Sequence, residues 1–442
     1  MTKKSANRKW GTLYLLAASV FVWSIALLRA RTACLTYDEA YSYCSYIHPL
    51  QLTKLSSIKA VFTDCFANNH ILNTVLCNLA VKLSGRYWND FVIRIPVLIF
   101  FGIYLSMVIV MYQRKKIGCI AATFLIWNYY MNEFFGLARG YGLAAAMVMA
   151  ALVMYQLWCD SACQKFRYLS LFLLFMTLGV MANTIVLLIF AAFIPYIGYQ
   201  LLRGKKLFRY AGCQCFVWIP LLLINIMLLR YHMMVTGDGK PLHVGSRVWE
   251  NVCKSYAESL VINEAAAQIV AVAALVLVIA GVILFVVNRR CGQSCYLFPG
   301  LCYFAILLVL QFWVRLGLPR GRELLPSYPV IVLLLAECTK EIGVFCQKRM
   351  SSERAAVCRS VSNAFGALAG VVLIVLFLFR IDLESYSEWR DEKDYREIAY
   401  DAVTNPDADY EAIFNMDYPM QYYWAQIYLN EKFDIYTGQK VE

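Results

Sequence analysis

Apolar residues fall in long runs along most of this chain, and short polar connectors separate the runs. A helix needs about 20 consecutive apolar residues to cross a bilayer, and most of these runs approach that length. The pattern therefore predicts an all-α integral membrane fold with about eleven membrane-spanning helices. The runs cover roughly residues 11–28, 91–112, 117–131, 140–159, 167–182, 184–202, 210–229, 266–288, 296–314, 324–340 and 364–380.

The first long polar stretch, roughly residues 29–90, is too polar to span a membrane but carries apolar clusters. Within it, apolar residues recur at spacings of three and four, which is typical of amphipathic helices that lie along a membrane interface. We therefore expect an amphipathic first extracytoplasmic loop. The clusters are Leu50, Leu52, Leu55 and Ile58, followed by Ile71, Leu72, Val75, Leu76 and Leu79.

The last polar stretch, residues 381–442, is rich in tyrosine and is interrupted by Pro406 and Pro419. Its aromatic content favours a small folded extracytoplasmic appendage, and a disordered tail is the alternative. The sequence thus predicts a transmembrane region at residues 1–380 and a C-terminal extracytoplasmic region at 381–442.

Composition supports the membrane assignment, because 61% of residues are hydrophobic and only 16% are charged. Soluble domains carry about 25% charged residues. The formal net charge of +12 could suggest a nucleic-acid partner, but about half of the 41 lysines and arginines lie in the short connectors on one side of the predicted spans. This asymmetry predicts a cytoplasmic N-terminus, an extracytoplasmic C-terminus and no nucleic-acid partner.

The sixteen cysteines show no metal-type spacing, and we expect neither a bound metal nor another cofactor. The predicted extracytoplasmic segments contain no Asn-x-Ser/Thr acceptor, which favours a bacterial plasma membrane. The basic N-terminus and first apolar run resemble a secretory signal. An uncleaved first helix is the preferred interpretation, because the run is about as long as a span and further spans follow.

Two adjacent carboxylates, Asp38 and Glu39, come directly after the first predicted helix. Ionisable residues at the membrane surface are costly unless they are paired or functional. Asp38 is the candidate general base, which would take a proton from an attacking hydroxyl. The alternative is that the acids only favour the first turn of the next helix.

Histidine and arginine side chains at the same predicted side are candidate ligands for a sugar or a phosphate. His70 stands among amides, and it could bind a sugar hydroxyl or make a local structural bond. Arg139 is suited to gripping a phosphate, with snorkelling to the interface as the alternative. Arg320 and Arg322 belong to a cluster that violates the positive-inside tendency, so a lipid phosphate or anionic headgroups should face them.

Four short motifs follow one another along the chain: Asp38-Glu39-Ala40, Arg94-Ile95-Pro96, Ala138-Arg139-Gly140-Tyr141 and Arg322-Glu323-Leu324-Leu325-Pro326. Their residues and their order resemble the GT-C superfamily of glycosyltransferases, within the branch of protein O-mannosyltransferases and aminoarabinose transferases (glycosyltransferase family 39-like). Two departures from the family pattern stand out. The loop around His70 lacks the family's prolines, and Leu137 occupies a position where many members carry glutamate, for which Glu133 is a candidate substitute.

The resemblance implies transfer of a sugar from a polyprenyl-phosphate donor to a hydroxyl of a glycan, lipid or protein, with inversion. By that mapping Asp38 and Glu39 are catalytic, and His70, Arg139, Tyr141, Arg320 and Arg322 bind the donor. A transporter or flippase of lipid-linked saccharides and an oligosaccharide ligase or polymerase are the alternatives. Transporters usually place charges inside spans and show paired halves, whereas here ionisable residues gather at one face.

Overall fold

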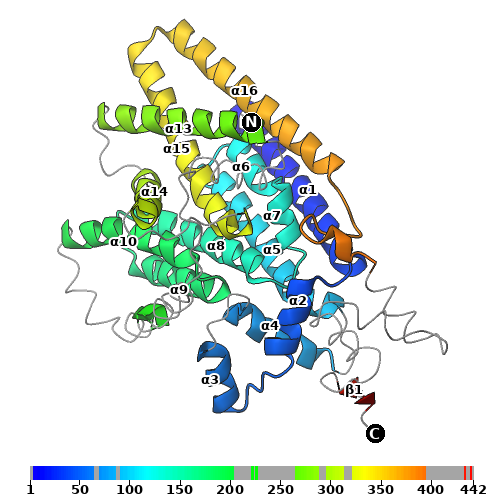
Figure 1. The fold of residues 1–442 in the computed structure, drawn as a ribbon. Coiled ribbons are helices and arrows are strands. Elements are labelled where there is room, and N and C mark those ends of the chain that lie inside the picture. Colours follow the sequence, from blue (N-terminus) through cyan, green and yellow to red (C-terminus); the bar gives the residue numbers. More distant parts are fainter. Residues whose placement is uncertain are drawn as a thin grey trace. The chain divides into compact units, whose positions relative to one another are not determined.

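The computed structural model of the protein describes residues 3–63, 69–85, 90–203, 221–222, 224–226, 264–287, 295–312, 321–394, 433–434 and 439–440 (Figure 1). These residues are predominantly helical. The α-helices are α1 (Lys3–Thr32), α2 (Tyr37–Ser42), α3 (Leu55–Thr63), α4 (Ile71–Leu83), α5 (Asp90–Gln113), α6 (Cys119–Ile126), α7 (Tyr129–Phe134), α8 (Gly140–Asp160), α9 (Phe166–Ala182), α10 (Val186–Arg203), α13 (Glu264–Val287), α14 (Leu297–Phe312), α15 (Tyr328–Arg349) and α16 (Ser352–Phe379).

Shorter elements complete the described chain. A π-helical turn, η1 (Tyr43–Ile47), follows α2, and two 3-10 turns, η2 (Gly321–Ser327) and η3 (Arg390–Glu392), precede α15 and follow α16. Strands β1 (Phe433–Asp434) and β2 (Gln439–Lys440) pair antiparallel. They are the described part of the predicted C-terminal appendage beyond residue 394.

Six helices of the described chain are long and apolar enough to cross a membrane, which agrees with a membrane protein. They lie within α1, α5, α8, α10, α13 and α16, and three shorter apolar helices lie within α4, α9 and α14. Most of the predicted run at 210–229 falls outside the described residues. The count of eleven spans, the interfacial position of the first loop and the orientation of the termini stay predictions.

The predicted run at 117–131 forms two short helices, α6 and α7, instead of one span. The break falls at Asn128, whose side-chain oxygen accepts the backbone N–H of Met131 at 2.8 Å and so caps the start of α7. Asn132 donates to the carbonyl oxygen of Ile126 at 3.0 Å, which satisfies an acceptor at the end of α6. Asn128 within the apolar run and Asn132 directly after it therefore stop one helix and start another.

The chain divides into two compact units, and the first comprises residues 1–22, 102–132 and 144–380. Within it, α15 packs against α6, α13, α14 and α16 (Figure 1). The approach is close where α13 meets α15, because a Cβ atom added to Gly281 would lie 2.6 Å from the Cβ of Cys338. Glu337 on α15 accepts the backbone N–H groups of Cys295, Tyr296 and Leu297 at 2.8–3.0 Å, so its carboxylate caps the N-terminus of α14.

The second unit comprises residues 23–101, 133–143 and 381–442, and it holds most of the predicted site residues. Residues 381–394 share this unit with the first loop, and the predicted division into regions 1–380 and 381–442 stays a prediction. Asn78 on α4 donates to the carbonyl oxygens of Ile47 and Leu50 at 2.7 and 3.0 Å, which fixes the end of η1. A buried apolar cluster in the second unit comprises Cys34, Leu35, Ala40, Tyr43, Ile47, Cys77, Ile93 and Ala138.

Candidate functional site

Helix α2 begins immediately after α1 because Thr36 and Glu39 form a capping box. The Thr36 hydroxyl accepts the backbone N–H of Glu39 at 3.3 Å, and the Glu39 carboxylate accepts the backbone N–H of Thr36 at 3.1 Å. This reciprocal arrangement fixes Asp38 in the first turn of α2. The preference for acidic residues in the first turn of a helix therefore explains part of the role of Asp38 and Glu39.

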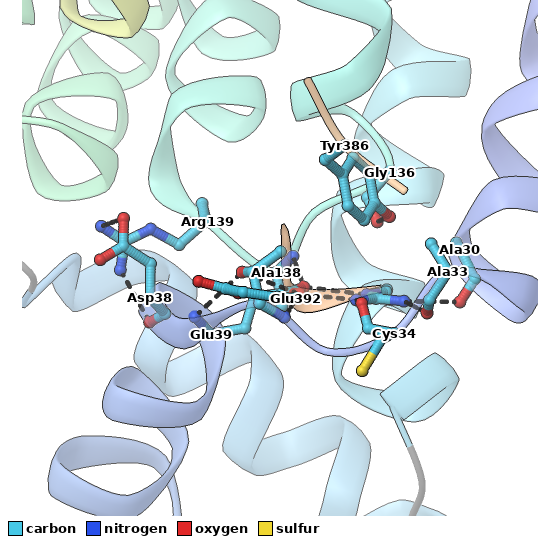
Figure 2. Close-up of polar contacts among 12 residues, drawn as sticks. Ala30, Ala33, Cys34, Asp38, Glu39, Gly136, Ala138, Arg139, Tyr386 and Glu392 are labelled. Atoms are coloured by element: carbon cyan, nitrogen blue, oxygen red, sulfur yellow. Dashed lines mark hydrogen bonds and ion pairs between the residues drawn. The ribbon is translucent and has the colours of Figure 1, made fainter. Parts of the chain in front are cut away.

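The Glu39 carboxylate is buried and is held by a guanidinium. Arg94 on α5 donates to it through Nε at 2.9 Å and through Nη2 at 2.6 Å, a bidentate pair in which both side chains are fully buried. The backbone N–H of Ala138 adds a third donor at 2.6 Å (Figure 2). Arg94 uses its other N–H groups on the carbonyl oxygens of Ala30, Ala33 and Cys34, at 2.8–3.1 Å. All five guanidinium N–H groups therefore have acceptors.

The Asp38 carboxylate lies beside a second buried arginine. Arg139 Nη2 lies 3.5 Å from Asp38 Oδ2, and Arg139 Nη1 donates to the Asp38 carbonyl oxygen at 3.1 Å and to Ser42 Oγ at 2.7 Å. The Arg139 side chain is fully buried, whereas the Asp38 side chain is 9% exposed. At 3.5 Å this contact is longer than the 2.7–2.9 Å typical of charge-assisted bonds. The Asp38 side chain thus keeps a small exposure, whereas the Glu39 side chain has none.

His70 and Tyr141 lie next to this pair. Their rings are 5.1 Å apart in an edge-to-face arrangement, and the Arg139 guanidinium carbon is 6.0 Å from the centre of the Tyr141 ring. Asn73 on α4 donates to the carbonyl oxygen of Ala138 at 2.8 Å and so joins the helix that follows His70 to the 133–143 segment. The structure brings together the predicted residues Asp38, Glu39, His70, Arg139 and Tyr141 from three separate parts of the sequence.

The remaining predicted arginines are not part of this described cluster. Arg320 lies outside the described residues, and Arg322 is partly buried in η2 of the first unit. A shared grip on one phosphate by Arg139 and Arg322 stays a prediction. In the described part of the chain, no group of three or more histidine, cysteine, aspartate or glutamate side chains could hold a metal ion.

Sequence reasoning did not find the partners of Glu133, the candidate substitute for the family's glutamate. The Glu133 carboxylate lies 3.8 Å from the Arg29 guanidinium, and both side chains are buried. It also accepts from the backbone N–H and the hydroxyl of Ser387 at 3.1 and 3.0 Å. The segment around Ser387 gave only a weak sequence signal, an Asp-x-x-Ser turn at Asp382.

No protein-family model matches the chain, and no curated protein sequence matches it significantly.

Proposed function

We propose that the protein is a glycosyltransferase that moves a sugar from a polyprenyl-phosphate donor to a hydroxyl acceptor at the non-cytoplasmic membrane face. The observation that carries the proposal is that two adjacent acids differ in burial and in their contacts. The Glu39 side chain is fully buried in a bidentate pair with Arg94, while the Asp38 side chain is 9% exposed and lies beside Arg139, His70 and Tyr141. A fully buried acid with several hydrogen-bond donors suits positioning, and an acid with a slightly exposed carboxylate suits proton transfer.

The proposed chemistry is one displacement at the anomeric carbon. The acceptor oxygen bonds to that carbon while the bond from the carbon to the lipid-phosphate oxygen breaks, so the configuration inverts. The acceptor proton passes to the Asp38 carboxylate, and the electron pair of the broken bond leaves with the phosphate. Arg139, with Arg320 and Arg322, would stabilise the departing phosphate, and His70 and Tyr141 would contact the sugar.

Both acids of the Asp38-Glu39 pair were predicted to be catalytic, and the contacts favour different tasks for them. Arg94, Ala138 and Thr36 donate to the Glu39 carboxylate and leave it little room for a substrate. We therefore assign to Glu39 the positioning of α2, and to Asp38 the proton transfer. Since a monophosphate leaving group can be stabilised by arginines, the proposal includes no obligatory divalent metal.

The proposed setting is a bacterial plasma membrane with about eleven spans, a cytoplasmic N-terminus and an extracytoplasmic C-terminus. The distribution of basic residues between the connectors supports this orientation. The acceptor is a glycan, a lipid or a protein of the cell envelope.

The test is transfer of radiolabelled sugar from a panel of polyprenyl-phosphate sugars by purified protein in lipid, with Asp38→Asn alongside. This variant keeps the shape of the side chain and removes the proton acceptor, so a loss of turnover by about 10²-fold or more is expected. Asp391→Asn, which removes an exposed carboxylate outside the cluster, is the matched control and should keep full turnover.

Near-normal turnover of Asp38→Asn would refute the base assignment. Tight donor binding by wild-type protein without any transfer, unchanged by Asp38→Asn, would instead favour a transporter or flippase. Transfer of whole oligosaccharides but no single sugar would favour a ligase or polymerase.

A further inference from the structure

Residues Asp382–Glu392, here called the return segment, follow α16 and lie against the end of α1 within the second unit. Arg29 Nε donates to the Asp382 carbonyl oxygen at 2.5 Å, and the Thr32 hydroxyl donates to the Leu383 carbonyl oxygen. The Asp382 carboxylate accepts from the Ser385 hydroxyl at 2.6 Å and from the Ser385 backbone N–H at 3.2 Å. These bonds give the segment a defined turn where it leaves the helix.

Tyr386 of the return segment covers the buried Glu39–Arg94 pair. Its ring centre is 5.4 Å from the Arg94 guanidinium carbon, and its hydroxyl donates to the Gly136 carbonyl oxygen at 2.8 Å (Figure 2). Burial raises the pKa of Tyr386 well above its usual value, so the hydroxyl stays protonated and able to donate. The side chain therefore joins the 133–143 segment to the arginine that holds Glu39.

An aromatic row continues from the return segment into the candidate site. Trp389 lies 6.1 Å from Phe134, Phe134 lies 5.3 Å from Tyr141, and Tyr141 lies 5.1 Å from His70, all between ring centres. Each contact is edge-to-face, the arrangement that aromatic pairs favour. The return segment thus adjoins the predicted ligands Tyr141 and His70 through packed rings.

Glu392, the last residue of the return segment, contacts the start of α2. Its carboxylate oxygen Oε2 accepts the backbone N–H of Tyr37 at 2.7 Å. Tyr37 is the first residue of α2, and the first N–H groups of a helix have no partner within the helix. The residue next to Tyr37 is Asp38, so this bond holds the backbone that carries the proposed base.

We infer that Glu392 is a positioning residue of the active site, which fixes Asp38 by binding the N–H of Tyr37. This inference rests on the proposed function for its kinetic consequence. The physical contact can be tested without activity, because an amide bonded to a carboxylate exchanges its hydrogen slowly.

The experiment compares Glu392→Ala, Glu392→Gln and the control Asp391→Asn in lipid, by amide hydrogen exchange of residues 36–42 and by transfer kinetics. Glu392→Ala should speed exchange at Tyr37 and lower kcat about tenfold with KM within about twofold, which is the order expected for a hydrogen bond to a charged group. Glu392→Gln keeps an oxygen acceptor and should restore most of kcat. Asp391→Asn should match wild type in both measurements.

Unchanged exchange at Tyr37 in Glu392→Ala would overturn the inference, because the bond would then not hold α2. Equal loss of kcat in Glu392→Gln and Glu392→Ala would overturn it as well, since a mere loss of charge would explain both. If wild-type protein transfers no sugar from any donor, the proposed function fails, while exchange at Tyr37 still decides whether Glu392 holds α2.

Discussion

Replacement of Glu39 by glutamine should strongly destabilise the protein. The change removes the only charge that the described structure places against the Arg94 guanidinium in a bidentate pair, and Arg94 is fully buried. An uncompensated buried charge after loss of its partner costs about 3–5 kcal/mol. At about 2–4 °C per kcal/mol for domains of 150–250 residues, the unfolding temperature should fall by about 6–20 °C.

The measurement is the fraction of protein that stays monodisperse in detergent after heating at a series of temperatures. Asp160→Asn is the matched control, because Lys116 and Asp160 form an ion pair at the same 2.6 Å distance with side chains that are 27% and 34% exposed. Exposed pairs contribute about 0–1 kcal/mol, so this variant should lose no more than a few degrees. If the unfolding temperature of Glu39→Gln falls no more than that of Asp160→Asn, then burial does not make the Glu39–Arg94 pair more stabilising than an exposed pair.

Two further predictions concern the second unit. Gly142→Ala should lower the unfolding temperature in the same heating assay, because the added Cβ would lie 2.6 Å from the Phe134 carbonyl oxygen; a variant as stable as wild type would contradict this close approach. Burial, the largest single influence, raises the pKa of Asp382, but hydrogen bonds from Ser385 and Glu384 and the charge of Arg29 outweigh it and leave the pKa below its usual 3.8. The return segment should therefore be held most strongly above about pH 4, and its contacts should weaken as the pH falls through the lowered pKa. Pepsin should then cleave within residues 382–392 more readily at pH values below that pKa. Asp382→Asn should remove this pH dependence, and an identical pH profile in the variant would refute the assignment.

The sequence predicted the long helices well, because their apolar runs are continuous. The run at 140–159 corresponds to α8 and the run at 167–182 to α9. It did not predict the break at Asn128, since a side-chain cap within an apolar run leaves the average hydrophobicity almost unchanged. The start of α15 at Tyr328 also lies later than the run at 324–340 indicated, because η2 occupies residues up to Ser327.

The candidate site was only partly predictable. Charged and polar residues in apolar surroundings stand out, and Asp38, His70 and Arg139 were found in that way. Which arginine meets which acid depends on the packing of distant segments, so the pairing of Glu39 with Arg94 and of Glu133 with Arg29 was not expected from spacing. The polar and aromatic sequence of the return segment also gave no indication of its contacts with Arg29 and Thr32 of α1.

The bond between Tyr37 and Glu392 joins residues 355 positions apart, and the bond between Arg29 and Asp382 joins residues 353 positions apart. During synthesis, α2 and its carboxylates leave the ribosome long before the residues of the return segment that bind α1 and α2 have been made. Contacts of such long sequence separation form late and slowly. Asp38 should therefore reach its final setting only after α16 has been made and inserted, so a nascent chain that stalls before that helix would carry an unfinished site in the membrane.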